Sequence, residues 1–388
     1  MDFASYKMSD VSATTATIHI ESLKHNLRVF QKSCPGLNIM AVVKANAYGH
    51  GSVPIAAALT QEGISFLAVA TISEAVELRT AGISERILVF GAPRKSCAAA
   101  YDEFDLEATI TGTDSLAELE SVSSVKVHIN LDTGMGRVGL QADELESTVR
   151  TIEQHQHLEL IGLGTHFSTA DHPDSTFTGQ QWSRFLRAVD VLGSAPAEIH
   201  AASSSAVFTV PESIDTDIVT VARIGVGLYG LLDLPNTDLP SSFRPVMTLE
   251  SEISHIKNVS AGTPISYDGT WRAPRSTRIA SVAAGYADGV PRHLSNCGLV
   301  HIGGKAYPIV GTVCMDMFMV DIGSHGDQSR HIHTGDPVII FGKNGPSAIE
   351  VARTAGTIAY ELVCRVGNRV PRIYFDENLQ DHTDGRLH

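Results

Sequence analysis

Short apolar runs alternate with helix-like segments between residues 37 and 223, and this alternation limits the fold more than any other feature of the chain. Eight of the runs read as buried strands, at 37–43, 66–70, 87–90, 107–110, 125–129, 158–164, 197–201 and 218–221. Between them, apolar residues at helical spacing predict helices at 73–81, 115–122, 144–153 and 180–192. Eight strands alternating with helices predict a (β/α)8 barrel. An open doubly wound sheet is the alternative, but it usually carries a glycine-rich turn after its first strand, where Lys44 stands here.

The character of the sequence changes after Gly230. Residues 231–244 are rich in Pro, Asp and Ser and read as a linker. Strand-like runs separated by Gly and Pro follow, at 247–259, 277–283, 299–302, 307–310, 317–322 and 338–341. Two helices at 348–355 and 358–366 precede a last strand near 373–375. We therefore expect a barrel domain over residues 12–240 and a mainly β domain over 241–388, which the alternating residues 15–20 could join.

Composition excludes several functional classes. The net charge of −14 argues against a nucleic-acid or anionic-membrane partner. No apolar run approaches the roughly 20 residues of a membrane helix, and the N-terminus lacks a secretory pattern. The five scattered cysteines read as reduced thiols of a cytoplasmic protein. The densest groups among the 17 histidines, at 171–174 and 331–333, lack the i, i+4 spacing of metal ligands on a helix, so loop histidines are expected rather than a metal site.

Polar residues recur where the predicted strands end, which is where barrels of this class place their chemistry. Lys44 ends the first strand within the string Ala-Val-Val-Lys-Ala-Asn-Ala-Tyr-Gly-His-Gly (residues 41–51). Burial lowers the pKa of a lysine and yields a free amine that can form a Schiff base, although a lone lysine there would more often be a surface residue. The other strands are followed by Asn130, Asp132, His166, Ser203, Ser204, Ser205, Arg223 and Gly225.

The lysine string closely resembles the pyridoxal-phosphate (PLP) lysine motif of the alanine racemases, which are PLP enzymes of fold type III. Further strings agree with that family in the same order. They are Leu-Asp-Thr-Gly-Met-Gly-Arg-Val-Gly (131–139), Val-Ala-Arg-Ile-Gly-Val-Gly-Leu-Tyr-Gly (221–230), Ile-Ser-Tyr-Asp-Gly-Thr-Trp (265–271), Gly-Tyr-Ala-Asp-Gly (285–289) and Val-Cys-Met-Asp-Met (313–317). The resemblance runs from about Thr15 to Tyr374 and implies a TIM barrel followed by a mainly β domain.

The resemblance implies the interconversion of L- and D-alanine by two bases. Lys44 would remove the α-proton of the D-isomer and Tyr267 that of the L-isomer. Because a phenol ordinarily keeps its proton at neutral pH, positively charged neighbours would have to favour the phenolate. Besides Lys44, the family's cofactor contacts fall on Tyr48, His166, Ser204, Arg223, Gly225, Val226 and Tyr360, and its substrate contacts on Arg137, Tyr286 and Met315.

Two consequences of the resemblance concern partners and the cofactor ring. The strings of Tyr267, Tyr286 and Met315 come from the partner subunit in the family, which implies a homodimer with shared active sites. Arg223 would face the pyridine nitrogen of PLP. Since an arginine does not release its proton, that nitrogen stays unprotonated and PLP becomes a weaker electron sink. Such a cofactor favours racemisation over transamination.

Two positions depart from the family pattern. Asn130 stands where many members carry a carbamylated lysine that pairs with the arginine matching Arg137. We expect the Asn130 amide to hold Arg137, with a bound chloride or no anion supplying the missing charge. The segment at 200–206 carries three consecutive serines where the family usually shows Asn-Ser-Ala-Ala, so Ser203 could replace Ser204.

Other readings stay open at this point. The substrate could be serine or a broader range of amino acids. Decarboxylases of basic amino acids share the fold type, but they generally place a cysteine on the second domain and lack the 285–289 and 313–317 strings. A non-catalytic PLP carrier would usually be a single barrel. The D-alanine could supply peptidoglycan precursors, or the enzyme could serve D-alanine breakdown.

Overall fold

A computed structural model describes residues 12–172, 174, 176–192, 196–234, 243–324 and 331–376. The chain divides into two compact units. The barrel unit consists of Lys24–Ala47 and Gly51–Phe243, and the β unit of Met1–Leu23, Tyr48–His50 and Arg244–His388. The two units are described separately.

The barrel unit is built on a parallel sheet of eight strands in the order β8-β7-β6-β5-β4-β3-β2-β9. The strands are β2 (Asn38–Val42), β3 (Phe66–Val69), β4 (Arg86–Val89), β5 (Glu107–Ile110), β6 (Val125–Leu131), β7 (Leu158–Thr165), β8 (Glu198–His200) and β9 (Val221–Ile224). The two ends of the sheet meet where the Thr220 amide donates to the Ile199 carbonyl (3.0 Å) and the Arg223 amide to the Ala202 carbonyl (3.1 Å). The predicted (β/α)8 barrel is therefore confirmed.

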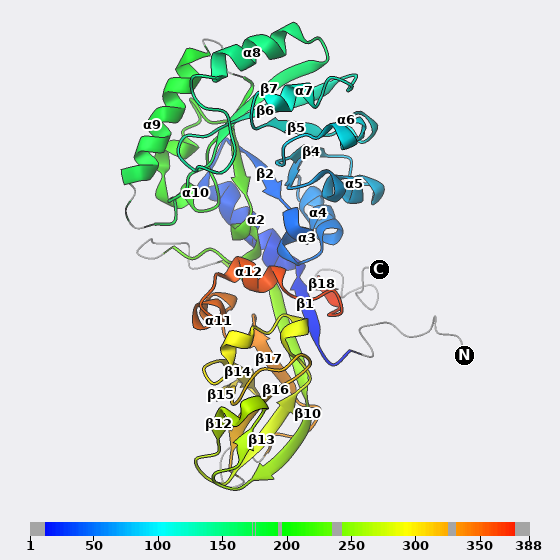
Figure 1. Ribbon diagram of the computed structural model, residues 1–388, viewed down its shortest axis with the longest axis vertical. Coiled ribbons are helices and arrows are strands. Elements are labelled where there is room, and N and C mark those ends of the chain that lie inside the picture. Colours follow the sequence, from blue (N-terminus) through cyan, green and yellow to red (C-terminus); the bar gives the residue numbers. More distant parts are fainter. Residues whose placement is uncertain are drawn as a thin grey trace, which may run out of the picture. The chain divides into compact units, whose positions relative to one another are not determined.

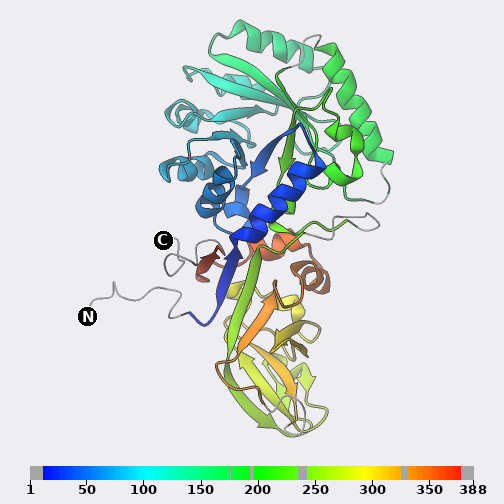
Figure 2. The same ribbon diagram turned by 180° about the vertical axis from the view of Figure 1, so that it is seen from behind.

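Helices cover the outside of this sheet (Figure 1). They are α4 (Ser52–Gln61), α5 (Ile72–Thr80), α6 (Ala99–Glu103), α7 (Asp114–Ala117), α8 (Leu145–Gln154), α9 (Thr176–Val191) and α10 (Ala206–Thr209). A further helix, α2 (Ile20–Ser33), packs on the barrel from Lys24 onward (Figure 2). Its Phe30 ring lies 5.6 Å from the ring of Phe208 and 5.3 Å from that of Phe243.

Two predicted strand boundaries were wrong, and both affect site residues. The strand β6 continues to Leu131, so Asn130 lies inside it rather than after it. The strand β9 begins at Val221, because the amides of Ile218 and Val219 instead close a turn onto the Asp215 carbonyl. Arg223 therefore lies within β9, and only Gly225 follows the strand.

The β unit is organised on one long strand, β10 (Met247–Val259), which pairs with β1, β13 and β17. The other strands are β1 (Thr15–His19), β11 (Pro264–Ile265), β12 (Trp271–Arg272), β13 (Thr277–Val282), β14 (Leu299–Ile302), β15 (Lys305–Pro308), β16 (Phe318–Gly323), β17 (Pro337–Phe341) and β18 (Arg372–Phe375). The helices α11 (Ala348–Thr354) and α12 (Ala359–Cys364) complete it. The strand β1 lies between β10 and β18. The prediction of a second, mainly β part is confirmed.

Candidate active site

Lys44 stands at the start of a left-handed helical turn directly after β2. The turn, α3 (Lys44–Tyr48), has φ angles of 52° to 54° from Ala45 to Tyr48. Each non-glycine residue in this conformation costs about 1–2 kcal/mol, so the surroundings must hold it. The Ala45 amide donates to the Glu74 carboxylate (2.6 Å). Asn adopts this conformation as a single residue, but nothing in Ala or Tyr as residue types predicts such a run, and the sequence analysis missed it.

Arg223 is buried in the barrel unit with its terminal nitrogens surrounded by acceptors. Its Nη1 donates to the carbonyl and to Nδ1 of His200, the latter at 2.8 Å. Its Nη2 donates to the Thr165 carbonyl (2.5 Å) and lies 3.3 Å from Nδ1 of His166 and 3.4 Å from the Ala201 carbonyl. Among the described residues no group accepts from its Nε–H. Burial and the nearby Arg137 lower the pKa of Arg223 to about 10, so it stays charged at neutral pH.

His166 follows β7 directly, as predicted, and lies among cations. Burial and the charges of Arg223, Arg137 and Lys44 lower the pKa of His166 to about 3. The imidazole is therefore neutral at physiological pH. Because Arg223 can only donate, Nδ1 of His166 accepts and its proton sits on Nε2. Three positively charged residues of the barrel unit thus converge on one neutral histidine.

Ser204 joins the end of β8 to the end of β9. Its buried hydroxyl oxygen accepts hydrogen bonds from the amides of Gly225 (3.0 Å) and Gly227 (3.2 Å). Because the Ser204 oxygen already accepts two hydrogen bonds, its hydroxyl hydrogen remains as a donor. The Val226 amide lies in the chain between the two amides that Ser204 binds. Ser203 has a weaker role, since the one hydrogen bond of its hydroxyl within the described residues is accepted from the Ala206 amide at 3.4 Å. The predicted use of the Gly225 amide for a ligand would require displacing its bond to Ser204.

The expected contact between Asn130 and Arg137 is wrong. The Asn130 amide nitrogen donates instead to the Val138 carbonyl at 2.8 Å, within the loop that follows β6. Arg137 is exposed and makes no hydrogen bond or ion pair with any residue that the structure describes. The loop returns so closely that a Cβ on Gly139 would lie 2.8 Å from the Asn130 amide nitrogen. This close approach of the backbone leaves the Asn130 amide facing Val138.

In the β unit, three predicted site residues are exposed: Tyr267 (68%), Met315 (52%) and Tyr286 (45%). The loops of Tyr286 and Met315 are joined backbone to backbone, because the Tyr286 amide donates to the Cys314 carbonyl at 3.0 Å. A Cβ on Gly285 would lie 2.2 Å from the Met315 carbonyl oxygen, so only glycine permits this approach.

The β unit also contains an ion pair between the half-exposed Arg369 and the buried Asp288, and a pair of tyrosines. The Arg369 guanidinium donates to both oxygens of Asp288 (2.7 and 2.9 Å) and to Asp316 (2.6 Å), which ties the loops of Tyr286 and Met315 together.

Tyr48 and Tyr360 of the β unit lie close to each other. Burial, and then Tyr360, raise the pKa of Tyr48 above its usual value, so its hydroxyl keeps its proton.

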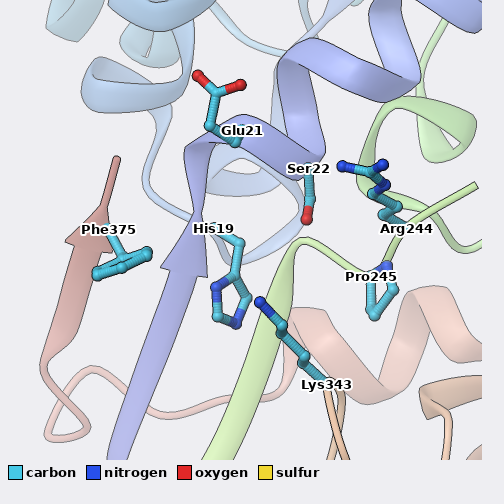
Figure 3. Close-up of a pocket in the computed structure, with 7 residues that line it drawn as sticks. All are labelled: His19, Glu21, Ser22, Arg244, Pro245, Lys343 and Phe375. Atoms are coloured by element: carbon cyan, nitrogen blue, oxygen red, sulfur yellow. The ribbon is translucent and has the colours of Figure 1, made fainter. Parts of the chain in front are cut away.

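Two cavities are described, and Lys44 lines neither of them. The first, of about 200 Å³, belongs to the β unit and is lined by His19, Glu21, Ser22, Arg244, Pro245, Lys343 and Phe375 (Figure 3). The second, of about 410 Å³, lies between the loop after β6 and α9, beside Thr133 and Arg184. Neither contains a predicted site residue. The described residues include no cluster that could hold a metal ion and no helix that could cross a membrane.

Most of the chain is similar in sequence to known alanine racemases. The chain matches the family model of the alanine racemase N-terminal domain over residues 18–233 and that of the C-terminal domain over 246–374. Alanine racemase from Chlorobaculum tepidum is 40% identical over 370 residues, covering 92% of this chain and 94% of the relative. The alanine racemase of Desulforamulus reducens is also 40% identical, covering 92% and 98%.

Solved structures give the same result. An alanine racemase from D-cycloserine-producing Streptomyces lavendulae superposes with a TM-score of 0.88 at 33% identity, covering 96% of this chain and 99% of that one. The alanine racemase of Bacillus anthracis with bound L-Ala-P gives a TM-score of 0.85 at 35% identity, covering 94% and 96%.

The neutral histidines make stability depend on pH. The pKa of His166 is about 3, and burial and Arg223 hold that of His200 well below its usual value. Below about pH 6.5 these histidines bind protons in the unfolded chain but not in the folded barrel. The free energy of unfolding that they contribute is therefore complete above that pH and is lost as the pH falls.

Urea unfolding should show the free energy of unfolding falling between about pH 7 and pH 5, by up to about 1.4 kcal/mol per pH unit for each histidine. His200→Gln should reduce that slope, whereas exchange of the exposed His293 for Gln should not. An unchanged slope in His200→Gln would contradict the assignment.

Proposed function

The chain belongs to the alanine racemase family, and we propose on this premise that it interconverts L- and D-alanine with PLP as cofactor. The observation that carries the proposal is the buried Arg223 held beside His166, an imidazole whose pKa the charges of Arg137 and Lys44 also lower. Such a site offers positive charge to an anionic cofactor and to a substrate carboxylate. It lies among the ends of the strands of the barrel, where this fold places its chemistry.

The residues of the barrel unit fit PLP. The Arg223 Nε–H, which no described residue uses, would donate to the pyridine nitrogen. The Ser204 hydroxyl hydrogen and the Val226 amide would donate to the phosphate. The family resemblance adds Tyr48 and Tyr360, which belong to the β unit, as further phosphate contacts. The Lys44 amine would hold the cofactor covalently. When bound, PLP supplies the electron withdrawal that makes the α-proton of an amino acid acidic enough to remove.

Inversion at a carbon atom needs a proton acceptor on one face and a proton donor on the other. We assign these roles to the Lys44 amine, which takes the α-proton of the D-isomer, and to the Tyr267 hydroxyl, which takes that of the L-isomer. His166 would support the second role, because its Nδ1 accepts from Arg223 and its Nε2–H is left to donate to the phenolate oxygen of Tyr267. Arg137 and the Met315 amide would orient the substrate carboxylate, and Tyr286 would narrow the entrance.

The exposure of Tyr267, Tyr286 and Met315 supports a homodimer in which these side chains complete the site of the partner subunit. The cytoplasm fits the reduced cysteines and the acidic net charge. Alanine is favoured over serine and over a basic amino acid, because both domains match the alanine racemase models. Supply of D-alanine for peptidoglycan precursors is the role consistent with this activity.

Circular dichroism of amino-acid solutions tests the activity directly. We expect L-alanine incubated with enzyme and PLP to lose its signal completely, since the equilibrium mixture of the two antipodes has none. L-serine should react much more slowly and L-lysine not at all. A solution of L-alanine that keeps its signal would refute the proposal, and release of carbon dioxide from L-lysine would favour a decarboxylase.

Mixed dimers test the shared site. Lys44→Ala and Tyr267→Ala should each be inactive alone. If Tyr267 serves the partner's Lys44, dissociation and reassociation of a mixture should create heterodimers with one intact site of two, and should restore up to about a quarter of wild-type activity. Mixtures of either variant with itself are the controls. No recovery from a mixture that demonstrably contains heterodimers would show that both residues act within one chain.

Serine variants decide which hydroxyl meets the phosphate. Ser204→Ala removes an acceptor from two buried amides as well as the free hydroxyl donor. We expect it to weaken PLP binding by about tenfold or more, measured by titrating the cofactor-free chain. Ser203→Ala is the matched control and should change binding little. The opposite order would assign the phosphate to Ser203.

A further inference from the structure

A row of buried polar side chains crosses the interior of the barrel and ends at Arg223. His200 Nδ1 lies 2.8 Å from Arg223 Nη1, and His200 Nε2 lies 3.1 Å from His128 Nδ1. His128 Nε2 in turn lies 2.9 Å from Glu107 Oε2. The strand β5 contributes Glu107, β6 His128, β8 His200 and β9 Arg223. The proposed function uses only the last of these.

Only one arrangement of protons satisfies all three contacts. Arg223 can only donate, so His200 accepts at Nδ1 and carries its proton on Nε2. That proton is donated to His128 Nδ1, which must therefore be an unprotonated acceptor. His128 carries its own proton on Nε2 and donates it to the Glu107 carboxylate. The hydrogen bonds thus all run in one direction, from a fixed cation to a fixed anion.

Any other protonation sets two hydrogens against each other. If His128 carried a proton on Nδ1, His200 would have to accept at Nε2 and carry its proton on Nδ1. That proton would face the Arg223 Nη1–H across 2.8 Å. Because the arginine does not give up its proton, this alternative breaks the contact at the site.

The strand β7 carries glycine at the two positions that face the imidazoles of His128 and His200. A Cβ on Gly162 of β7 would lie 1.9 Å from His128 Nδ1, and a Cβ on Gly164 would lie 2.2 Å from His200 Nδ1. Glycine weakens the interior of a strand, so two such residues here mark a close approach that larger side chains would exclude. The two histidines therefore have a dedicated space within the barrel core.

The far end of the row is anchored by an ion pair. Arg86 donates to both oxygens of Glu107, at 2.6 and 3.0 Å. Burial opposes ionisation of Glu107, but the hydrogen bonds from His128 and Arg86 outweigh it and hold the pKa of its carboxyl below the usual value. Glu198 accepts from the same arginine but lies 3.8 Å from His128 Nε2, beyond hydrogen-bond distance.

We propose that Glu107 and His128 are positioning residues for the cofactor arginine. By fixing both histidines in the Nε2–H form they make His200 an acceptor for Arg223 Nη1. The guanidinium is thereby held with its Nη hydrogens used by the protein and its Nε–H left for the pyridine nitrogen. The inference rests on the proposed function for the identity of that last partner, whereas the proton arrangement stands on the barrel unit alone.

Nitrogen NMR of the full-length holoenzyme labelled with ¹⁵N-histidine tests the proton arrangement without reference to activity. We expect His128 and His200, identified by the loss of their signals in single variants, to carry a proton on Nε2 and none on Nδ1. A proton on Nδ1 of either ring would overturn the inference. The tautomers are measured on the wild-type chain, and the variants serve only to assign the signals.

Glu107→Gln tests the positioning, and Glu198→Gln is its matched control. Both remove one carboxylate that faces Arg86, but only Glu107 also accepts from His128. A glutamine at 107 has one acceptor oxygen for three donors, so the row loses its anchor. We expect Glu107→Gln to weaken PLP binding by about tenfold or more and to change the absorption spectrum of the bound cofactor. Glu198→Gln should stay within about twofold of wild type.

The outcomes separate this inference from the proposed function. If the wild-type chain binds PLP and racemises alanine, but the two glutamine variants bind PLP equally well, the positioning role is refuted and the function stands. If the wild-type chain neither binds PLP nor racemises alanine, the proposed function fails. The same NMR measurement on the full-length chain without PLP then still decides the proton arrangement of the barrel row, because none of its three contacts involves the cofactor.

Discussion

The buried guanidinium of Arg223 is the constraint on which the barrel unit depends. Removing a charge from water costs several kcal/mol, and the protein offsets this only by surrounding the ion with acceptors. Here those acceptors are main-chain carbonyls at the ends of β7 and β8 together with two imidazoles. Burial, and then repulsion by Arg223, lower the pKa of both histidines, so both are neutral at physiological pH. The charge of Arg223 thus acts on both His166 and His200.

The turn at Lys44 has an unfavourable backbone conformation that contacts elsewhere in the barrel unit must offset. Four consecutive residues with positive φ are unfavourable, and they persist because the chain on both sides is fixed. The hydrogen bond from the Ala45 amide to Glu74 links the turn to the capping box that starts α5, in which Thr71 and Glu74 bond each other's backbone. The turn thereby fixes the backbone from which the Lys44 side chain extends. Proton transfer at a fixed carbon benefits from this restriction.

Much of this architecture could be predicted from the sequence, because eight apolar runs at regular intervals leave few alternatives to a barrel. The runs could not locate Arg223 within β9, since Ile218 and Val219 are as apolar as a strand but close a turn onto Asp215. The side chains at the strand ends were recognised from their types and order. The row from Glu107 to His200 was missed because its members lie on different strands, and their proximity follows from barrel closure rather than from spacing. The glycines at 162 and 164 were the only local signal.

Asn130 changes the balance of charges around Arg137 from the one that the family pattern implies. A carbamylated lysine at this position would place a negative charge beside Arg137, whereas asparagine is neutral and donates its amide to Val138. The Arg137 charge is therefore not offset by any ion pair within the described residues. It acts instead on the rest of the site, where it contributes to lowering the pKa of both His166 and Arg223. With a neutral residue at position 130, the cationic groups Lys44, Arg137 and Arg223 have no carbamate charge to offset them, and positive charge of this kind attracts phosphates and carboxylates.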